Sequence, residues 1–173
     1  MVNIFELFGD RSMLRVLQYY LERPTEKTYR AQLEKNLKLS KVSIGKALQK
    51  LQNAGILEKQ AVGRTLLYSL ANSNGMVKEL KRLLAISKVN EVFKKLQQPN
   101  CEIYLYGSAA RGENDEKSDL DVLIICDRRG NFFSGLRDEK IKPLLLTRIE
   151  YAALARKDKP FYERLEKDRT RIL

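Results

Sequence analysis

The chain contains no histidine and only two cysteines among its 173 residues. A structural zinc site needs four cysteine or histidine ligands, and Ser/His/Asp or Cys/His catalysis needs an imidazole. Both kinds of site are excluded, so any metal ion here must be held by oxygen ligands. Cys101 and Cys126 lie beside two neighbouring predicted strands, and we expect reduced thiols that pack as small apolar side chains.

Long apolar runs are also missing. No stretch approaches the roughly 18 apolar residues that span a bilayer. The first residues, MVNIFELFGDRSML, lack the basic start, apolar middle and small-residue cleavage site of a secretory signal. We therefore expect a cytoplasmic protein with no membrane partner. Its length suits one ordinary domain or two small ones, and we predict two.

Acidic residues are scarce in the first part of the chain. Residues 1–72 carry 12 Lys and Arg against 6 Asp and Glu, whereas residues 101–173 carry 15 against 14. The excess of positive charge therefore lies mainly before residue 101. Charge alone leaves two readings open for that part, a polyanion partner or a merely solubilising surface.

Three helices and a hairpin are predicted in residues 1–72. The first helix runs from Asn3 to about Leu21, with an interruption near Gly9-Asp10. The second helix, YRAQLEKNL, takes Thr28 as its cap and turns Ala31, Leu33 and Leu37 inward. The third, KVSIGKALQKLQNA, begins after Ser40, buries Ile44, Leu48 and Leu51, and ends at Gly55. Two strands, ILEKQAV and TLLYSLA, are joined at Gly63-Arg64.

This order resembles a winged helix-turn-helix. The segment SKVSIGKALQKLQNAGILEK is similar to the recognition helix and first wing strand of bacterial and archaeal winged-helix regulators, which end in an LxxLxxxGIL pattern. The resemblance implies binding to double-stranded DNA, usually as a homodimer, with the third helix in the major groove. The first helix and the connector then offer candidate dimer surfaces. The outward residues expected to contact DNA are Lys41, Ser43, Lys46, Gln49 and Lys50 on the third helix and Arg64 at the hairpin tip.

A helical connector is predicted over residues 73–100. Its apolar residues change face near Ser87, which indicates either two short helices or one helix that packs on two partners in turn. Met76, Leu80, Leu83 and Leu84 form the first stripe; Ile86, Val89, Phe93 and Leu96 form the second.

Residues 101–173 alternate strands with helices, as in a small α/β or α+β module with one sheet. The expected elements are strand CEIYLY, a turn at Gly107-Ser108, strand LDVLIIC, loop DRRGN, a helical stretch near FSGLRDEKI, strand PLLLTRI, and helices AALARK and PFYERLEKDR.

Negative charge gathers at one place in this module. Five acidic residues occur within nine positions directly after Gly107-Ser108. Asp119 and Asp121 are two apart at the head of a strand, so their side chains emerge on one face and repel unless a cation neutralises them. Mg²⁺ suits such a pair, and Gly107, Ser108 and the backbone N–H groups after them suit phosphate. The residues thus indicate one site that offers donors to phosphate groups and acceptors to a metal ion.

The same string resembles a known family motif. Gly-Ser, ten residues and Asp-x-Asp is the pattern of the DNA polymerase β nucleotidyltransferase superfamily, and the form GSxARGxxxxxSDLD is that of the minimal nucleotidyltransferases. The resemblance implies transfer of a nucleoside monophosphate to a hydroxyl, with Asp119 and Asp121 holding up to two Mg²⁺ ions and Gly107 and Ser108 holding phosphates. Arg111 either lies over the triphosphate or forms an ion pair within the domain. The chain is therefore expected to be α+β, with a winged helix-turn-helix domain over residues 1–72, a helical connector over 73–100 and a small nucleotidyltransferase-fold α/β domain with a mixed sheet over 101–173.

One part of the family pattern is missing. Active members carry a third carboxylate on the next strand, and alignment of Thr147 places Leu144 where it should stand. Losing this ligand should impair catalysis more than nucleotide binding, so whether the chain is an enzyme stays open.

Three functions follow as hypotheses. The first is a DNA-binding regulator fused to a nucleotidyltransferase that modifies a partner, in the manner of an antitoxin acting on a toxin-like protein. The second is a transcription regulator whose last domain only senses a nucleoside triphosphate. The third, a transferase acting on RNA ends, ranks last because the tyrosines that would stack on bases are scattered along the sequence: Tyr19, Tyr20, Tyr29 and Tyr68.

Overall fold

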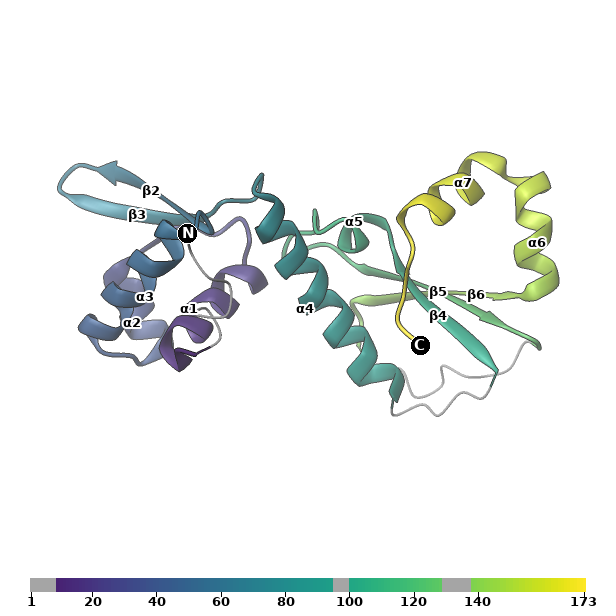
Figure 1. The fold of residues 1–173 in the computed structure, drawn as a ribbon, viewed down its shortest axis with the longest axis horizontal. Coiled ribbons are helices and arrows are strands. Elements are labelled where there is room, and N and C mark those ends of the chain that lie inside the picture. The colour runs from purple at the N-terminus through teal and green to yellow at the C-terminus, as the bar shows by residue number, and fades with distance from the viewer. Residues whose placement is uncertain (1–8, 95–99, 129–137) are drawn as a thin grey trace. The chain divides into compact units, whose positions relative to one another are not determined.

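The structure is a computed structural model that describes residues 9–94, 100–128 and 138–173 (Figure 1). The chain folds as two compact units, residues 1–78 and 79–173, and this division falls inside the predicted connector. No helix within the described ranges is long and apolar enough to cross a membrane. Several predicted features lie outside the described residues: Ile4, Leu7, Phe8, Leu96, Pro99, most of the loop DRRGN and most of the stretch FSGLRDEKI.

The first unit contains three helices and a small antiparallel sheet. Its elements are α1 (Arg11–Glu22), β1 (Thr28–Tyr29), α2 (Arg30–Leu37), α3 (Lys41–Asn53), β2 (Leu57–Val62) and β3 (Thr65–Leu70), and the sheet order is β1-β3-β2.

Helix α1 begins where the sequence indicated an interruption. The carboxylate of Asp10 accepts hydrogen bonds from the backbone N–H groups of Ser12 and Met13, so it caps the helix. The buried face of α1, which includes Val16 and Tyr20, packs against α3.

The prediction that Thr28 caps the second helix is wrong. Thr28 and Tyr29 form β1 beside β3, and Tyr29 is the residue before α2. Thr28 is fully buried and its hydroxyl shares a hydrogen bond of 2.5 Å with that of Tyr20. Ala31, predicted to turn inward, is exposed, whereas Leu33 is buried as predicted.

Helix α3 and the hairpin after it confirm the sequence prediction. The Ser40 hydroxyl accepts from the backbone N–H of Ser43 and so caps the helix. Gly55 lies just beyond the helix with φ +70°, a conformation that favours glycine. The three predicted inward residues, Ile44, Leu48 and Leu51, are all buried.

The second unit has a mixed four-stranded sheet between helices. Its elements are the later part of α4 (Gly75–Lys94), then β4 (Cys101–Tyr106), α5 (Gly107–Ala110), β5 (Leu120–Cys126), β6 (Ile141–Thr147), α6 (Arg148–Lys157), α7 (Lys159–Asp168) and β7 (Thr170–Arg171). The sheet order is β6-β5-β4-β7, with β5 antiparallel to β4 and parallel to β6.

The connector is a single helix, α4, in the part that is described. Within the second unit its buried apolar side chains, Ala85, Val89 and Phe93, recur every four residues and pack on one face of the sheet. Leu83, assigned to the first apolar stripe, is 57% exposed, so that stripe is not a buried face throughout.

The two faces of β5 contact different helices. Val122 and Ile124 belong to the cluster that includes α4, whereas Leu123 and Ile125 pack with Leu165 of α7 in a second cluster. Asp121 has the same parity as Leu123, so it lies on the face that α6 and α7 cover.

The expectation of two reduced thiols is wrong in this structure. Cys101 and Cys126 are joined by a disulfide bond. The register of β4 and β5 places them directly opposite one another, with their Cα atoms 4.3 Å apart, the close spacing of a non-hydrogen-bonded antiparallel pair. The bond therefore ties together the two central strands of the sheet at one end.

Candidate functional site

The Gly-Ser corner and the Asp-x-Asp pair meet at one end of β4 and β5. Tyr106, the last residue of β4, pairs in register with Asp121 on β5. The chain then turns at Gly107, whose φ is +72°. A Cβ atom added to Gly107 would lie 2.6 Å from Oδ2 of Asp121, closer than side chains approach one another. Glycine is needed here both for the backbone turn and for the space that the carboxylate occupies.

The electrostatics of the pair favour a bound cation. Burial raises the pKa of Asp121, and the negative charge of Asp119 raises it further. Asp119 is exposed and lies just before β5. Its charge acts on Asp121, which indicates that the two carboxylates are near one another. A cation placed between them would relieve the repulsion.

The donor set limits the kind of metal ion that would fit. Among the residues that the structure describes, no three His, Cys, Asp or Glu side chains are grouped to hold a metal. Two carboxylates suit an ion that brings further oxygen ligands with it, as Mg²⁺ does on a triphosphate. They do not suit an ion held by the protein alone.

The other acids of the cluster have structural partners. Asp115 accepts from the backbone N–H groups of Lys117 and Ser118 and from the Ser118 hydroxyl, and so closes the turn before β5. The backbone carbonyl of Glu116 accepts from Nζ of Lys140 at 2.9 Å. The first acidic residues of the run therefore stabilise the loop before β5, whereas the last two, Asp119 and Asp121, form the carboxylate pair.

Arg111 forms ion pairs within the domain. Its guanidinium donates to Glu113 at 2.9 Å and to Asp168, the last residue of α7, at 2.5 Å. Both carboxylates raise the pKa of Arg111. The sequence left Arg111 either over a triphosphate or in an ion pair within the domain, and in the structure it forms the ion pair.

The neighbouring strand β6 carries no acid beside the pair. In register, Lys142 lies beside Asp121, and Leu144 lies beside Leu123. Leu144 packs in the apolar cluster with α6 and α7. Leu144 is therefore on the face of the sheet that carries Asp121, where the family pattern requires its third carboxylate.

Two acids that lie next to β6 in the sequence, Glu150 and Asp138, are engaged elsewhere. Glu150 binds the backbone N–H and hydroxyl of Thr147 in a capping box at the start of α6. Asp138 accepts from the backbone N–H of Lys140 in the turn before β6.

Tyr106 is a neighbour of the site that sequence reasoning did not single out. Burial, followed by the charge of Asp121, raises the pKa of its phenol. Its ring meets that of Phe161 from α7 edge to face, with centroids 6.4 Å apart. Its position directly before Gly107 was the one available clue.

In the first unit, the exposed side of α3 differs in part from the prediction. Lys41, Lys46 and Gln49 are exposed as expected. Lys50 is exposed too, but its Nζ lies 3.4 Å from Oδ2 of Asp10, so it forms an ion pair within the unit. Ser43 is half-buried and its hydroxyl shares a hydrogen bond with that of Ser40.

Two residues of the same helix face were missed. Val42 is 66% exposed, although it is apolar. Gly45 lies on that face with nothing within 4 Å of the place where a Cβ would stand. Arg64 follows Gly63, φ +59°, at the tip of the hairpin, as predicted.

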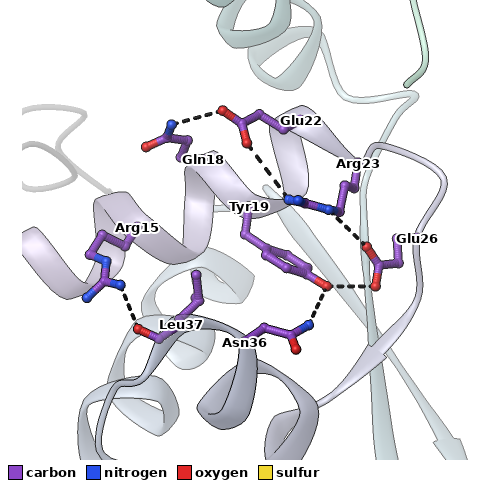
Figure 2. A pocket seen from close by; sticks show the side chains of 8 residues that line it. All are labelled: Arg15, Gln18, Tyr19, Glu22, Arg23, Glu26, Asn36 and Leu37. Atoms are coloured by element: carbon purple, nitrogen blue, oxygen red, sulfur yellow. Dashed lines mark hydrogen bonds and ion pairs between the residues drawn. The ribbon is translucent and has the colours of Figure 1, made fainter. Parts of the chain in front are cut away.

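A hollow of about 540 Å³ lies between α1 and α2 (Figure 2). The Tyr19 hydroxyl at its centre donates to Glu26 at 2.6 Å and accepts from Asn36 at 3.0 Å. Arg23 pairs with Glu22 and Glu26 on the rim. Because these polar groups bind one another, we assign the hollow no ligand.

A second hollow, of about 420 Å³, brings together residues that are far apart in the sequence. Tyr29 and Tyr68 both line it, because β1 pairs with β3. Tyr29 and Tyr68 are therefore far apart in the sequence but close together in the fold. The lining residues are Tyr29, Arg30, Ala31, Glu34, Lys41, Arg64, Thr65, Leu66 and Tyr68.

Comparison with known proteins bears on the second unit. Residues 86–171 match the model of the family "Nucleotidyltransferase domain". No curated protein matches the chain significantly. Two solved structures are similar in part. One is M. tuberculosis Rv0081, which is 20% identical, covers 53% of this chain and 86% of its own, and has a TM-score of 0.40. The other is a "putative nucleotidyltransferase" from Sulfolobus solfataricus, which is 19% identical, covers 57% of this chain and 87% of its own, and has a TM-score of 0.38. Neither likeness identifies the fold at such scores. The family match covers the segment that holds the Gly-Ser corner and both aspartates, so residues 86–171 are similar to a nucleotidyltransferase domain.

Proposed function

We propose that the second unit binds a nucleoside triphosphate at Gly107, Ser108, Asp119 and Asp121. The observation that carries the proposal is that the Asp121 carboxylate occupies the place where a Cβ of Gly107 would stand, since this brings the Gly-Ser corner and the pair of acids to one place. Mg²⁺ bound with the triphosphate would offset the charge of both carboxylates and polarise the phosphoryl groups. The residues themselves would orient the nucleotide: the corner would receive phosphate oxygens, and the two aspartates would hold the Mg²⁺ that the phosphates carry.

Nucleotidyl transfer is the second candidate function, and the family match favours it. In that reaction an acceptor hydroxyl oxygen bonds to the α-phosphorus, the bond from that phosphorus to the bridging oxygen breaks, pyrophosphate leaves, and the hydroxyl proton passes to solvent. Leu144 stands where a further carboxylate would assist the attacking oxygen, so the geometry supports binding better than turnover. A toxin-like protein remains our proposed acceptor.

For the first unit we propose a winged helix-turn-helix that binds double-stranded DNA, acting as a homodimer. The order of α1, α2, α3 and the hairpin supports it, as does the excess of positive charge in residues 1–72. Helix α3 would lie in the major groove with Val42, Lys46 and Gln49 toward the bases. The whole chain is then a transcription regulator that responds to a nucleotide.

Calorimetric titration of the full chain with each of the four nucleoside triphosphates and Mg²⁺ tests the nucleotide site. We expect one of them to bind, and Asp121→Asn to weaken that binding at least about tenfold because a charged ligand is lost. Asp115→Asn, in the same loop, is the control and should bind normally. No binding by the unaltered chain, or equal binding by Asp121→Asn, would overturn the proposal.

Transfer is followed in the same samples with nucleotide labelled at the α-phosphate. Label that appears in protein, and disappears in Asp121→Asn, would establish the transferase. Binding without label, also when a cell extract supplies acceptor proteins, would support the sensor.

A further inference from the structure

We infer that the 420 Å³ hollow between β1, α2, α3 and β3 holds one sugar-phosphate strand of a DNA duplex whose major groove receives α3. This inference rests on the proposed DNA binding, and it assigns a role to Arg30, Tyr29 and Tyr68, which the sequence did not connect with DNA.

The charges around the hollow suit a phosphate backbone. Arg30, Lys41 and Arg64 line it from three elements of the chain, against one acid, Glu34. Glu34 lies 3.3 Å from Nε of Arg30, an i,i+4 pair on α2. The pair engages Nε and so helps to orient the guanidinium at the edge of the hollow. A concave surface with three cations and one paired acid attracts anions rather than a neutral ligand.

The apolar part of the lining suits the deoxyribose groups of a DNA strand. Tyr29 is 39% exposed and Leu66 is 44% exposed, and both border the hollow with Tyr68. Exposed aromatic and aliphatic groups next to cations match the alternation of deoxyribose and phosphate along a strand. Tyrosine hydroxyls also donate to phosphate oxygens in protein–DNA contacts.

The position of the hollow favours a duplex over a single strand. Lys41, the first residue of α3, belongs both to the hollow and to the exposed face of the helix that carries Val42 and Lys46. A helix in the major groove has a phosphate strand along each side. A strand in the hollow would therefore run beside α3 and reach Arg64 at the hairpin tip. Single strands need bases stacked on aromatic faces, and the hollow has only two tyrosines among its cations.

Salt-dependent binding tests this assignment. The full chain, Arg30→Gln, Lys41→Gln and Arg23→Gln are titrated against a mixed-sequence oligonucleotide duplex, and against its separated strands, over a range of salt concentrations. Arg23→Gln is the matched control, because it removes the same charge from the hollow between α1 and α2. Thermal unfolding confirms that each variant is folded.

We expect Arg30→Gln and Lys41→Gln each to weaken duplex binding about five- to tenfold near 0.1 M salt and to reduce the slope of log K against log salt by about 0.9, the effect of one lost phosphate contact. Arg23→Gln should change neither quantity. Folded Arg30→Gln and Lys41→Gln variants with unchanged affinity and slope would overturn the inference while leaving DNA binding by α3 in place.

Two further outcomes separate the inference from the function on which it rests. If the unaltered chain binds no duplex in a salt-dependent way, the proposed DNA binding itself fails. If Arg30→Gln weakens binding to the separated strands more than binding to the duplex, the hollow holds unpaired nucleic acid, and the assignment to a duplex is wrong.

Discussion

Gly107 and Asp121 are in direct contact although fourteen positions separate them: an added Cβ on the glycine would stand 2.6 Å from a carboxylate oxygen of the aspartate. The antiparallel pairing of β4 with β5 produces the contact, because Tyr106 and Asp121 are partners in register. The spacing of ten residues between Ser108 and Asp119 is therefore the length of chain that leaves β4, forms α5 and the acidic turn, and returns to the start of β5.

Substitution of Gly107 by alanine should damage both the fold and the nucleotide site. The new methyl group meets the Asp121 carboxylate, and alanine at φ +72° is strained, so we expect a loss of about 1 to 3 kcal/mol in the free energy of unfolding. Displacement of Asp121 should also weaken nucleotide binding. Urea denaturation and calorimetric titration measure the two effects.

Gly63→Ala is the control for backbone strain. Gly63 has a similar φ, +59°, but nothing lies within 4 Å of an added Cβ. The Gly63→Ala variant should lose about 1 kcal/mol in the free energy of unfolding and bind nucleotide normally. Equal nucleotide affinity in the two variants would show that the contact with Asp121 does not shape the site.

Local patterns allowed the sequence to predict most of the elements. Ser40, Gly55 and the apolar spacing of α3 are short-range features, and the structure confirms each of them. The pair Asp119 and Asp121 was also predictable, because alternation along one strand fixes their common face.

Features that depend on strand register could not be predicted. Thr28 has the chemistry of a helix cap, but pairing with β3 draws it into the core. Tyr29 and Tyr68 are 39 positions apart and meet only through the same pairing. Cys101 and Cys126 are opposite one another because β4 and β5 pair side by side, and the first residue of β4 faces the last residue of β5. Register follows from the packing of the whole sheet, and no short window of the sequence contains it.

Gly45→Ala should make the protein more stable and a poorer DNA binder. Glycine within a helix costs about 0.5 to 1 kcal/mol relative to alanine. Apart from the neighbouring residues and the backbone of the helix itself, no atom of the described chain lies within 4 Å of the added methyl group. The chain's own packing therefore gives no reason for glycine at this face of α3, whereas the proposed close approach of a DNA groove would. Thermal unfolding and duplex titration provide the two measurements.

Gly75→Ala provides the comparison for that variant, since Gly75 begins α4 and also has open space around it. It should leave duplex affinity unchanged. If Gly45→Ala binds duplex as tightly as the unaltered chain, α3 does not approach DNA closely at this residue.

Leu144→Asp should restore transfer if a missing carboxylate limits the reaction. Leu144 lies on the face of Asp121 and packs with α6 and α7, so the change should cost about 1 to 3 kcal/mol of stability while raising label transfer about tenfold or more. Leu146→Asp is the matched control: it lies on the same face in the same cluster, beside Ile125 and farther from the pair. A folded Leu144→Asp variant that binds nucleotide but transfers no more label than Leu146→Asp would contradict the prediction.

The disulfide between Cys101 and Cys126 should stabilise the second unit measurably. A bond that closes a loop of 25 residues restricts the unfolded chain, and such a constraint is worth about 3 kcal/mol. We expect a thiol reductant to lower the free energy of unfolding of the unaltered chain by about this amount in urea denaturation, and to leave that of Cys101→Ser unchanged. The Cys126→Ser variant should behave like Cys101→Ser, because either change removes the same bond. If reductant destabilises the single-cysteine variants as much as the unaltered chain, the loss does not come from this bond, and the strands β4 and β5 are held by their ladder and by the packing of Val122 and Ile124 alone.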